Sequence, residues 1–156
     1  MIKIVKAEEY HISDIGELWS EFIRFHQDVD PIFIPHDNAL AGFEEEQVQR
    51  LMKSEDGLVL VALDGEKVVG YSLSEIKDPP RGLKREKFGY IYDTAVTAGY
   101  RRNGIGKKMF DEIIKWFQLK SIDRVELDIA TKNQVALSFW EKQGLTEYTR
   151  KLYKQI

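Results

Sequence analysis

The chain has 156 residues, 23 basic and 26 acidic side chains, a formal net charge of −3 and no cysteine. The lack of cysteine excludes disulfides, thiolate metal sites and a covalent cysteine nucleophile. The acidic balance offers no general attraction to nucleic acid, and no apolar run approaches the roughly 20 residues of a membrane span. We therefore expect a cytoplasmic protein with a single domain over residues 1–156 that binds neither nucleic acid nor membranes.

The first third of the chain predicts one strand and two helices. Residues 2–6 alternate in polarity like a strand, and Ser13 or Asp14 is expected to cap the helix that follows. The apolar face of this helix is expected to consist of Ile15, Leu18, Trp19, Phe22, Ile23 and Phe25. Two prolines then interrupt the chain before a second helix over residues 43–52.

The middle of the chain predicts a β-hairpin followed by another long strand. Residues 58–63 and 67–76 are rich in branched and aromatic side chains. Asp64-Gly65 between them suits the positive φ angles of a tight hairpin turn. After a proline-containing loop, residues 88–96 form the next expected strand.

The last third of the chain predicts a βαβ unit. A helix over residues 104–119 leads to a strand over 124–130, and a right-handed crossover makes this strand parallel to the one over 88–96. A helix over 133–143 and a strand over 147–154 are expected to follow. The pattern predicts a mixed α/β fold in which a central antiparallel sheet continues into a parallel βαβ core.

One segment between the strand over 88–96 and its helix predicts an anion site: Arg101-Arg102-Asn103-Gly104-Ile105-Gly106, here called the glycine loop. Glycines have no Cβ, so backbone N–H groups can approach an anion closely. The start of the next helix adds free amides and the positive end of its dipole, and arginines add charge-assisted contacts. The loop is therefore suited to a pyrophosphate.

Three other interpretations fit the glycine loop less well. A Walker A loop needs Gly-x-x-x-x-Gly-Lys-Ser/Thr, but Ile105-Gly106 stands where lysine and a hydroxyl are required. A dinucleotide site needs a third glycine, where Met109 stands, and further strands after Asp128. The third interpretation is a plain glycine turn that begins a helix without a ligand.

A fourth motif, Arg/Gln-x-x-Gly-x-Gly/Ala, fits the loop in full. A second block follows, with Asn133-Gln134-Val135-Ala136 and then Phe139-Trp140-Glu141-Lys142-Gln143-Gly144-Leu145. With the strand over 90–96, these blocks resemble the acetyl-CoA-binding core of the GCN5-related N-acetyltransferases (GNATs), and the expected order of elements matches that family throughout. The resemblance implies splayed strands, flanking helices, and transfer of acetyl from acetyl-CoA to a primary amine by direct attack in a ternary complex.

The resemblance also implies which residues bind coenzyme A. The backbone of Ala95 and Val96 would line the pantetheine arm, and the Val96 N–H would point at the thioester oxygen, where negative charge develops. Amides of the glycine loop would bind the pyrophosphate. The full expected set is Ala95, Val96, Arg101, Arg102, Asn103, Gly104, Ile105, Gly106, Lys107, Asn133, Ala136, Phe139, Trp140 and Lys142.

Catalysis is expected to involve Asp93 and Val96. A lysine-like amine has a pKa of about 10.4, so its attack needs a base. Asp93 stands where members of the family often carry an acidic residue; the alternative role is acceptance of backbone hydrogen bonds at the splayed strand. Trp140 replaces the tyrosine that protonates the leaving thiolate in the family, and an indole N–H is no useful acid. Water, Tyr148 or Tyr153 would take that role.

The resemblance implies that the acceptor binds near the first two helices and the loop before the central strand, and His26, Phe33, Tyr71 and Tyr92 are the candidate residues. Strand alternation is expected to place Tyr92 on the face opposite Asp93. No motif with metal-ligand spacing is present, and we expect no metal. Two functions remain open: an N-acetyltransferase for a small-molecule or peptide amine, and an acyl-CoA-binding module with little catalysis. The resemblance also leaves open a homodimer joined through the C-terminal strands, as often found in that family.

Overall fold

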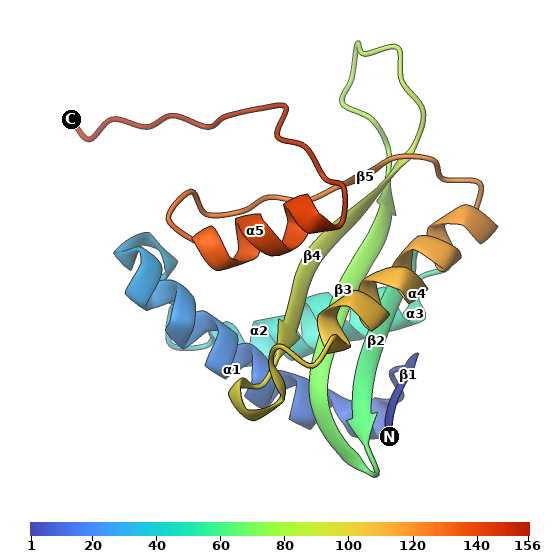
Figure 1. The fold of residues 1–156 in the computed structure, drawn as a ribbon. Helices are drawn as coiled ribbons and strands as arrows, with labels where there is room; N and C mark the ends of the chain where they lie inside the picture. The colour runs from blue at the N-terminus through green and yellow to red at the C-terminus, as the bar shows by residue number, and fades with distance from the viewer.

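A five-stranded mixed sheet forms the centre of the computed structural model, which describes residues 1–156 (Figure 1). The strands lie in chain order: β1 Ile2–Lys6, β2 Gly57–Asp64, β3 Lys67–Lys77, β4 Phe88–Val96 and β5 Val125–Glu126. The first four are antiparallel neighbours, and β5 runs parallel to β4. The expected mixed α/β fold with its parallel βαβ unit is confirmed.

Helices cover both faces of the sheet (Figure 1). The N-terminal group comprises η1 Glu9–His11, α1 Ile12–Val29, η2 Pro31–Phe33, α2 Ala39–Gly42, the π-helical η3 Phe43–Gln49 and α3 Arg50–Lys53. The C-terminal group comprises η4 Ala98–Tyr100, α4 Ile105–Leu119 and α5 Gln134–Lys142. None of these helices combines the length and the apolar character that crossing a membrane requires.

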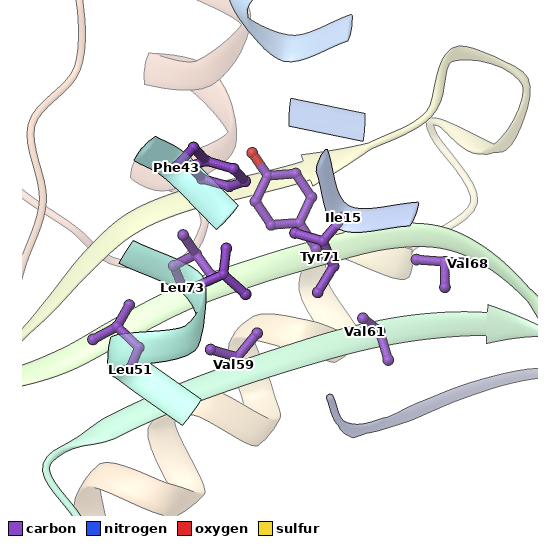
Figure 2. Packing of buried hydrophobic residues seen from close by; sticks show 9 residues of the cluster. Ile15, Phe43, Leu51, Val59, Val61, Val68, Tyr71 and Leu73 are labelled. Atoms are coloured by element: carbon purple, nitrogen blue, oxygen red, sulfur yellow. The ribbon is translucent and has the colours of Figure 1, made fainter. Parts of the chain in front are cut away.

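Each helical group packs against one face of the sheet. On the α1 face, the buried cluster consists of Ile15, Phe43, Val48, Leu51, Val59, Val61, Val68, Tyr71 and Leu73 (Figure 2). On the α4 face, it consists of Leu58, Leu60, Ile76, Ile91, Phe110, Ile113, Phe117, Ile122 and Trp140. Alternation along β3 explains this division, since Tyr71 and Leu73 point to one face and the residue between them to the other.

A one-residue irregularity interrupts the alternation in β4. Leu73 of β3 pairs with Asp93. The next residue, Ser74, pairs with Ile91, so Tyr92 is an extra residue without a partner on β3. Tyr92 packs against the α1-face cluster, and Asp93 lies opposite Leu73 on that same face. The expectation that Tyr92 and Asp93 face opposite ways is wrong, because this bulge resets the two-residue period.

Two elements differ from their expected bounds. Helix α1 begins at Ile12, directly after η1, so neither Ser13 nor Asp14 caps it. Only Val125 and Glu126 of the expected strand over 124–130 pair with β4. The rest of that segment has no strand neighbour because it diverges from β4 (Figure 1).

The expected strand over residues 147–154 is not formed. Residues 145–156 have no regular secondary structure and extend past α5 to the C-terminus (Figure 1). A strand requires a neighbour whose backbone N–H and C=O groups it can pair with, and this segment has none. Tyr148, Leu152 and Tyr153 are consequently exposed.

Candidate active site

The outer edge of β4 is unpaired along most of its length. β5 pairs with β4 only at Gly89 and Tyr90. Residues 127–130 then leave the sheet without regular structure, so residues 91–96 have no strand on that side. The result is a splayed pair of parallel strands that begins just after Tyr90.

The backbone of Val96 faces this unpaired edge. The Thr97 N–H donates to the Val69 carbonyl at 3.0 Å, so these two residues form a hydrogen-bonded pair. Bonded and non-bonded pairs alternate in an antiparallel ladder, which turns the N–H groups of Val96 and Thr94 away from β3. By the same alternation, the Ala95 backbone is directed to β3. Thr94, which the sequence interpretation missed, therefore joins Val96 at the edge.

The glycine loop joins β4 to α4 through left-handed backbone. Gly104 has a φ of 75° and directly precedes α4. A Cβ built at this position would meet no atom within 4 Å, so the space beside the loop is open. Arg102 also has a positive φ, 63°. Left-handed residues beside a helix N-terminus direct successive N–H groups outward, the geometry of an anion-binding nest.

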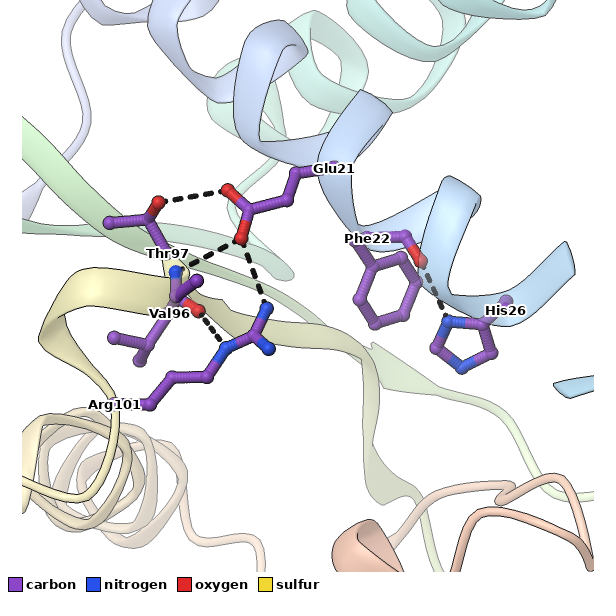
Figure 3. A network of polar contacts seen from close by, with 7 residues as sticks. Glu21, Phe22, His26, Val96, Thr97 and Arg101 are labelled. Atoms are coloured by element: carbon purple, nitrogen blue, oxygen red, sulfur yellow. Dashed lines mark hydrogen bonds and ion pairs between the residues drawn. The ribbon is translucent and has the colours of Figure 1, made fainter. Parts of the chain in front are cut away.

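Arg101 makes two hydrogen bonds to other residues of the protein, although its side chain is partly exposed (Figure 3). Its Nε donates to the Val96 carbonyl at 2.8 Å, and its Nη2 donates to Glu21 Oε1 at 3.1 Å. The same carboxylate accepts from the Thr97 hydroxyl at 2.8 Å and from the Ala98 N–H at 3.0 Å. Glu21, in the middle of α1, thus connects that helix to the end of β4 and to the glycine loop.

Two further cations lie in or next to the glycine loop, and only one of them is held in an ion pair. Lys107 Nζ pairs with Asp111 at 2.7 Å, one turn along α4. Arg102 is exposed and makes no ion pair within the chain. Of these side chains, Arg102 is the one free to contact an incoming anion.

Asp93 lies on the α1 face of β4 and has an elevated pKa. The Tyr71 hydroxyl donates to Asp93 Oδ2 at 3.2 Å. Burial raises the pKa of the Asp93 carboxyl to about 6, and the hydrogen bond from Tyr71 opposes that rise. The residue as a whole keeps part of its surface exposed, although its carboxyl is enclosed. Such a carboxyl is ionised near neutral pH and is more basic than an ordinary aspartate.

Tyr71 is suited to be a constant donor to Asp93. Burial and the nearby Asp93 charge raise the pKa of the Tyr71 hydroxyl well above its ordinary value. The phenol is fully buried among the residues shown in Figure 2. It therefore remains protonated at any pH at which the protein is studied.

The second sequence block forms α5 and packs it on the glycine loop. Asn133 caps the helix, because its Oδ1 accepts from the Ala136 N–H at 3.1 Å. Phe139 lies against Gly106, where a Cβ would be 3.3 Å from the ring. Lys142 is exposed in the last turn.

The four acceptor candidates form two groups. His26 Nδ1 lies 2.9 Å from the Phe22 carbonyl oxygen, and its ring meets Phe33 edge-on at 5.6 Å, near the end of α1. Tyr71 and Tyr92 lie on the sheet, on the same face as the Asp93 carboxyl.

Comparison with known proteins identifies the family. The model of the acetyltransferase (GNAT) family matches residues 15–145. The chain belongs to this family. Its residues are 30% identical over 94 positions to N-alpha-acetyltransferase 30 of Schizosaccharomyces pombe, covering 60% of each chain. They are also 30% identical over 105 positions to an N-alpha-acetyltransferase of Sulfurisphaera tokodaii, covering 64% of this chain and 62% of the relative. The chain thus spans about 60% of the length of these relatives.

Solved structures share the GNAT fold. A tetramutant of a Bacillus halodurans protein matches with a TM-score of 0.86 and 22% identity, covering 99% of both chains. An aminoglycoside acetyltransferase from an uncultured soil metagenomic sample matches with a TM-score of 0.70 and 24% identity, over 99% of this chain and 96% of that one. An aminoglycoside N-acetyltransferase in complex with CoA matches with a TM-score of 0.75 and 15% identity, over 100% and 95%.

Trp140 is a core residue in this GNAT protein. Its side chain is buried, with the Phe110 ring 5.5 Å and the Phe139 ring 4.8 Å away. Tyr148 packs its ring against Arg124 at 4.9 Å, and Tyr153 is 86% exposed. Neither tyrosine bonds to a residue of β4.

Several polar residues of this GNAT site escaped the sequence interpretation. Ser72 is buried, and its hydroxyl donates to the Asp93 carbonyl at 2.8 Å. Glu21 and Thr94, described above, also belong to this site, whereas Glu75, Lys77 and Tyr90 form a separate group of contacts described below. Alternation from Tyr71 predicts that Glu75 shares its face, but the contacts of Glu21 with residues far along the chain have no signal in the sequence.

Proposed function

We propose that this protein transfers the acetyl group of acetyl-CoA to a primary amine, which attacks the thioester directly in a ternary complex. The observation that carries the proposal is that the end of β4 presents the Val96 N–H at its unpaired edge and the enclosed Asp93 carboxyl on its α1 face. The first is a hydrogen-bond donor for a developing oxyanion. The second is a base for an ammonium proton.

The residues at the edge and the loop fit coenzyme A. The pantetheine arm requires backbone groups that no strand has taken, and Thr94 and Val96 offer them at the unpaired edge of β4. The pyrophosphate requires outward N–H groups and open space, which the conformation and surroundings of Gly104 supply. Acetyl-CoA brings the reactive thioester.

The reaction replaces the C–S bond of the thioester with a C–N bond. The neutral amine forms a C–N bond with the carbonyl carbon, and the C–S bond breaks. Asp93 accepts the proton that the amine loses, while the Val96 N–H donates a hydrogen bond to the carbonyl oxygen. Water protonates the leaving thiolate, a modest demand because thiols have a pKa of about 8.5. Trp140 takes no part, since it is buried in the core.

The acceptor is a small-molecule or peptide amine. The names of the relatives point to the α-amine of a polypeptide, and those of the structural neighbours to aminoglycosides. Both classes therefore belong in an acceptor panel, together with lysine peptides and polyamines.

The test is release of free thiol from acetyl-CoA in the presence of each acceptor. We expect release to rise with at least one amine and the acetylated amine to be detected by mass spectrometry. The buried tryptophan in place of the family's tyrosine favours the second candidate, an acyl-CoA-binding module. CoA binding without acceptor-dependent release on the whole panel would support that candidate and contradict the transferase.

A further inference from the structure

Two tyrosines on the α1 face of β4 hold an ammonium group of the chain itself. Lys77 Nζ lies 4.4 Å from the ring centroid of Tyr90 and 5.1 Å from that of Tyr92. The two rings are 4.9 Å apart and inclined at 70°. A cation within about 6 Å of an aromatic face is attracted by the ring quadrupole. We call Tyr90 and Tyr92 the tyrosine pair.

Each hydroxyl of the tyrosine pair donates to a carboxylate. The Tyr92 hydroxyl donates to Glu75 Oε2 at 2.6 Å, and the Tyr90 hydroxyl donates to Asp128. Arg50 neutralises Glu75, with Nη1 and Oε1 2.5 Å apart. Asp128 is exposed and makes no ion pair, so its negative charge adds to the attraction of the tyrosine pair for a cation.

The tyrosine pair lies beside the place assigned to the reacting amine. Tyr92 directly precedes Asp93, and both face α1 because of the bulge. The contact of Tyr90 with Asp128 connects β4 to the chain after β5, where the two strands begin to splay. Three residues of strand span about 10 Å. One acceptor molecule can therefore reach both Asp93 and the tyrosine pair.

We propose that the tyrosine pair binds a second ammonium group of the acceptor, and that Lys77 occupies this place until the acceptor displaces it. The inference rests on the proposed function and narrows its substrate class. The acceptor is an amine with a second cationic group within about 10 Å of the first. A small diamine or polyamine and a peptide with lysine at its free N-terminus both offer this chemistry.

Matched acceptors test the inference. The first pair is 1,4-diaminobutane and butylamine, and the second is Lys-Gly-Gly and norleucyl-Gly-Gly; each pair differs by one ammonium group. We expect the doubly charged member of the preferred pair to have a kcat/KM at least about threefold higher, the ratio that a cation–π contact of ordinary strength gives. The better of the two pairs tells whether the acceptor is a small molecule or a peptide.

Three variants distinguish cation binding by the tyrosine pair from a general effect on activity. Tyr90→Leu is expected to remove most of the preference for the doubly charged acceptor and to leave the singly charged one unchanged. Tyr90→Phe keeps the ring and should keep most of the preference. Lys77→Met removes the internal competitor, so the KM for the doubly charged acceptor should fall while that for the singly charged one stays the same. Thermal melting establishes that each variant is folded.

Calorimetry adds a readout that does not depend on turnover. 1,4-Diaminobutane is titrated into protein saturated with CoA, with butylamine as the control, and only the diamine should bind with measurable heat. Equal kcat/KM within both acceptor pairs would overturn the inference and leave the proposed function intact. A Lys77→Met protein with an unchanged KM for the diamine would overturn the displacement of Lys77. If the natural protein bound the diamine selectively but acetylated no acceptor of the panel, the cation site would be supported and the proposed function contradicted.

Discussion

The Asp93 carboxyl is enclosed in protein, yet one hydrogen bond, from Tyr71, is its only side-chain partner. Burial raises its pKa because the charged form loses hydration, and a single donor restores only part of that loss. A fully hydrogen-bonded carboxylate would instead have a lowered pKa and would be a weak base. The small number of hydrogen bonds to the Asp93 carboxylate is therefore the property that suits it to proton transfer.

Replacement of Asp93 by asparagine should change the dependence of the rate on pH. In the natural protein, kcat/KM should rise as pH increases through about 6, because the base is active only when deprotonated. Asp93→Asn should lack this rise and be slower by a factor of roughly 10² to 10⁴. Initial rates of thiol release from pH 5 to 9 measure both effects.

Tyr71→Phe is the matched control for that prediction. It removes the hydrogen bond that lowers the pKa of Asp93, so the rise in kcat/KM should move to higher pH and persist. An Asp93→Asn protein with an unchanged profile would show that another group accepts the proton.

At the scale of elements, Glu21 makes α1 and the glycine loop dependent on each other. Its carboxylate bonds to three groups that all lie between the end of β4 and the start of α4. Arg101 adds a bond to the Val96 carbonyl, next to the peptide whose N–H faces the unpaired edge. A movement of α1 would therefore shift the end of β4 and the start of the glycine loop.

A double-mutant cycle on Glu21→Ala and Arg101→Ala should reveal this coupling. Each single change should lower the free energy of unfolding, and the double change should cost less than their sum by about 1 kcal/mol, because the ion pair is partly exposed. Urea denaturation of the four proteins measures it. Strict additivity would mean that the two side chains do not stabilise each other in solution.

The glycine loop offers a second test at this scale. Gly104→Val places a branched side chain at a left-handed position and into the open space beside the loop, so CoA affinity should fall at least about tenfold. Gly99→Ala is the control, since a Cβ there meets no atom and the φ is ordinary. Calorimetric titration of CoA into both folded variants gives the comparison, and equal affinities would contradict the pyrophosphate assignment.

Across the whole molecule, local patterns predicted most elements but not the relations between distant ones. The hairpin of β2 and β3 follows from two runs of branched and aromatic residues joined by one Asp-Gly turn, and the helix α4 follows from its apolar spacing. The bulge at Tyr92 depends on which residues of β3 and β4 pair, which no single strand encodes. The segment over 147–154 has the composition of a strand, but without a neighbouring edge it stays irregular.

Ligand binding should stabilise the whole fold if CoA bridges elements that are otherwise held together by few contacts. At a concentration about 100 times its dissociation constant, CoA should add about 2.7 kcal/mol to the free energy of unfolding and raise the melting temperature by several degrees. NADH and ATP at the same concentration should not. A larger shift with either nucleotide would favour the dinucleotide or Walker A interpretation of the glycine loop.

The bulge in β4 also affects how this chain should be aligned with its relatives. Because Tyr92 is an added residue, Ile91 and Thr94 lie on the same face although they are three positions apart. In a related protein that lacks this extra residue, the remaining side chains of β4 would lie on the same faces of the sheet as they do here. Length differences in this strand should therefore be placed as a single gap at position 92, because a gap in a neighbouring loop would exchange the face that packs against α1 with the face that packs against α4.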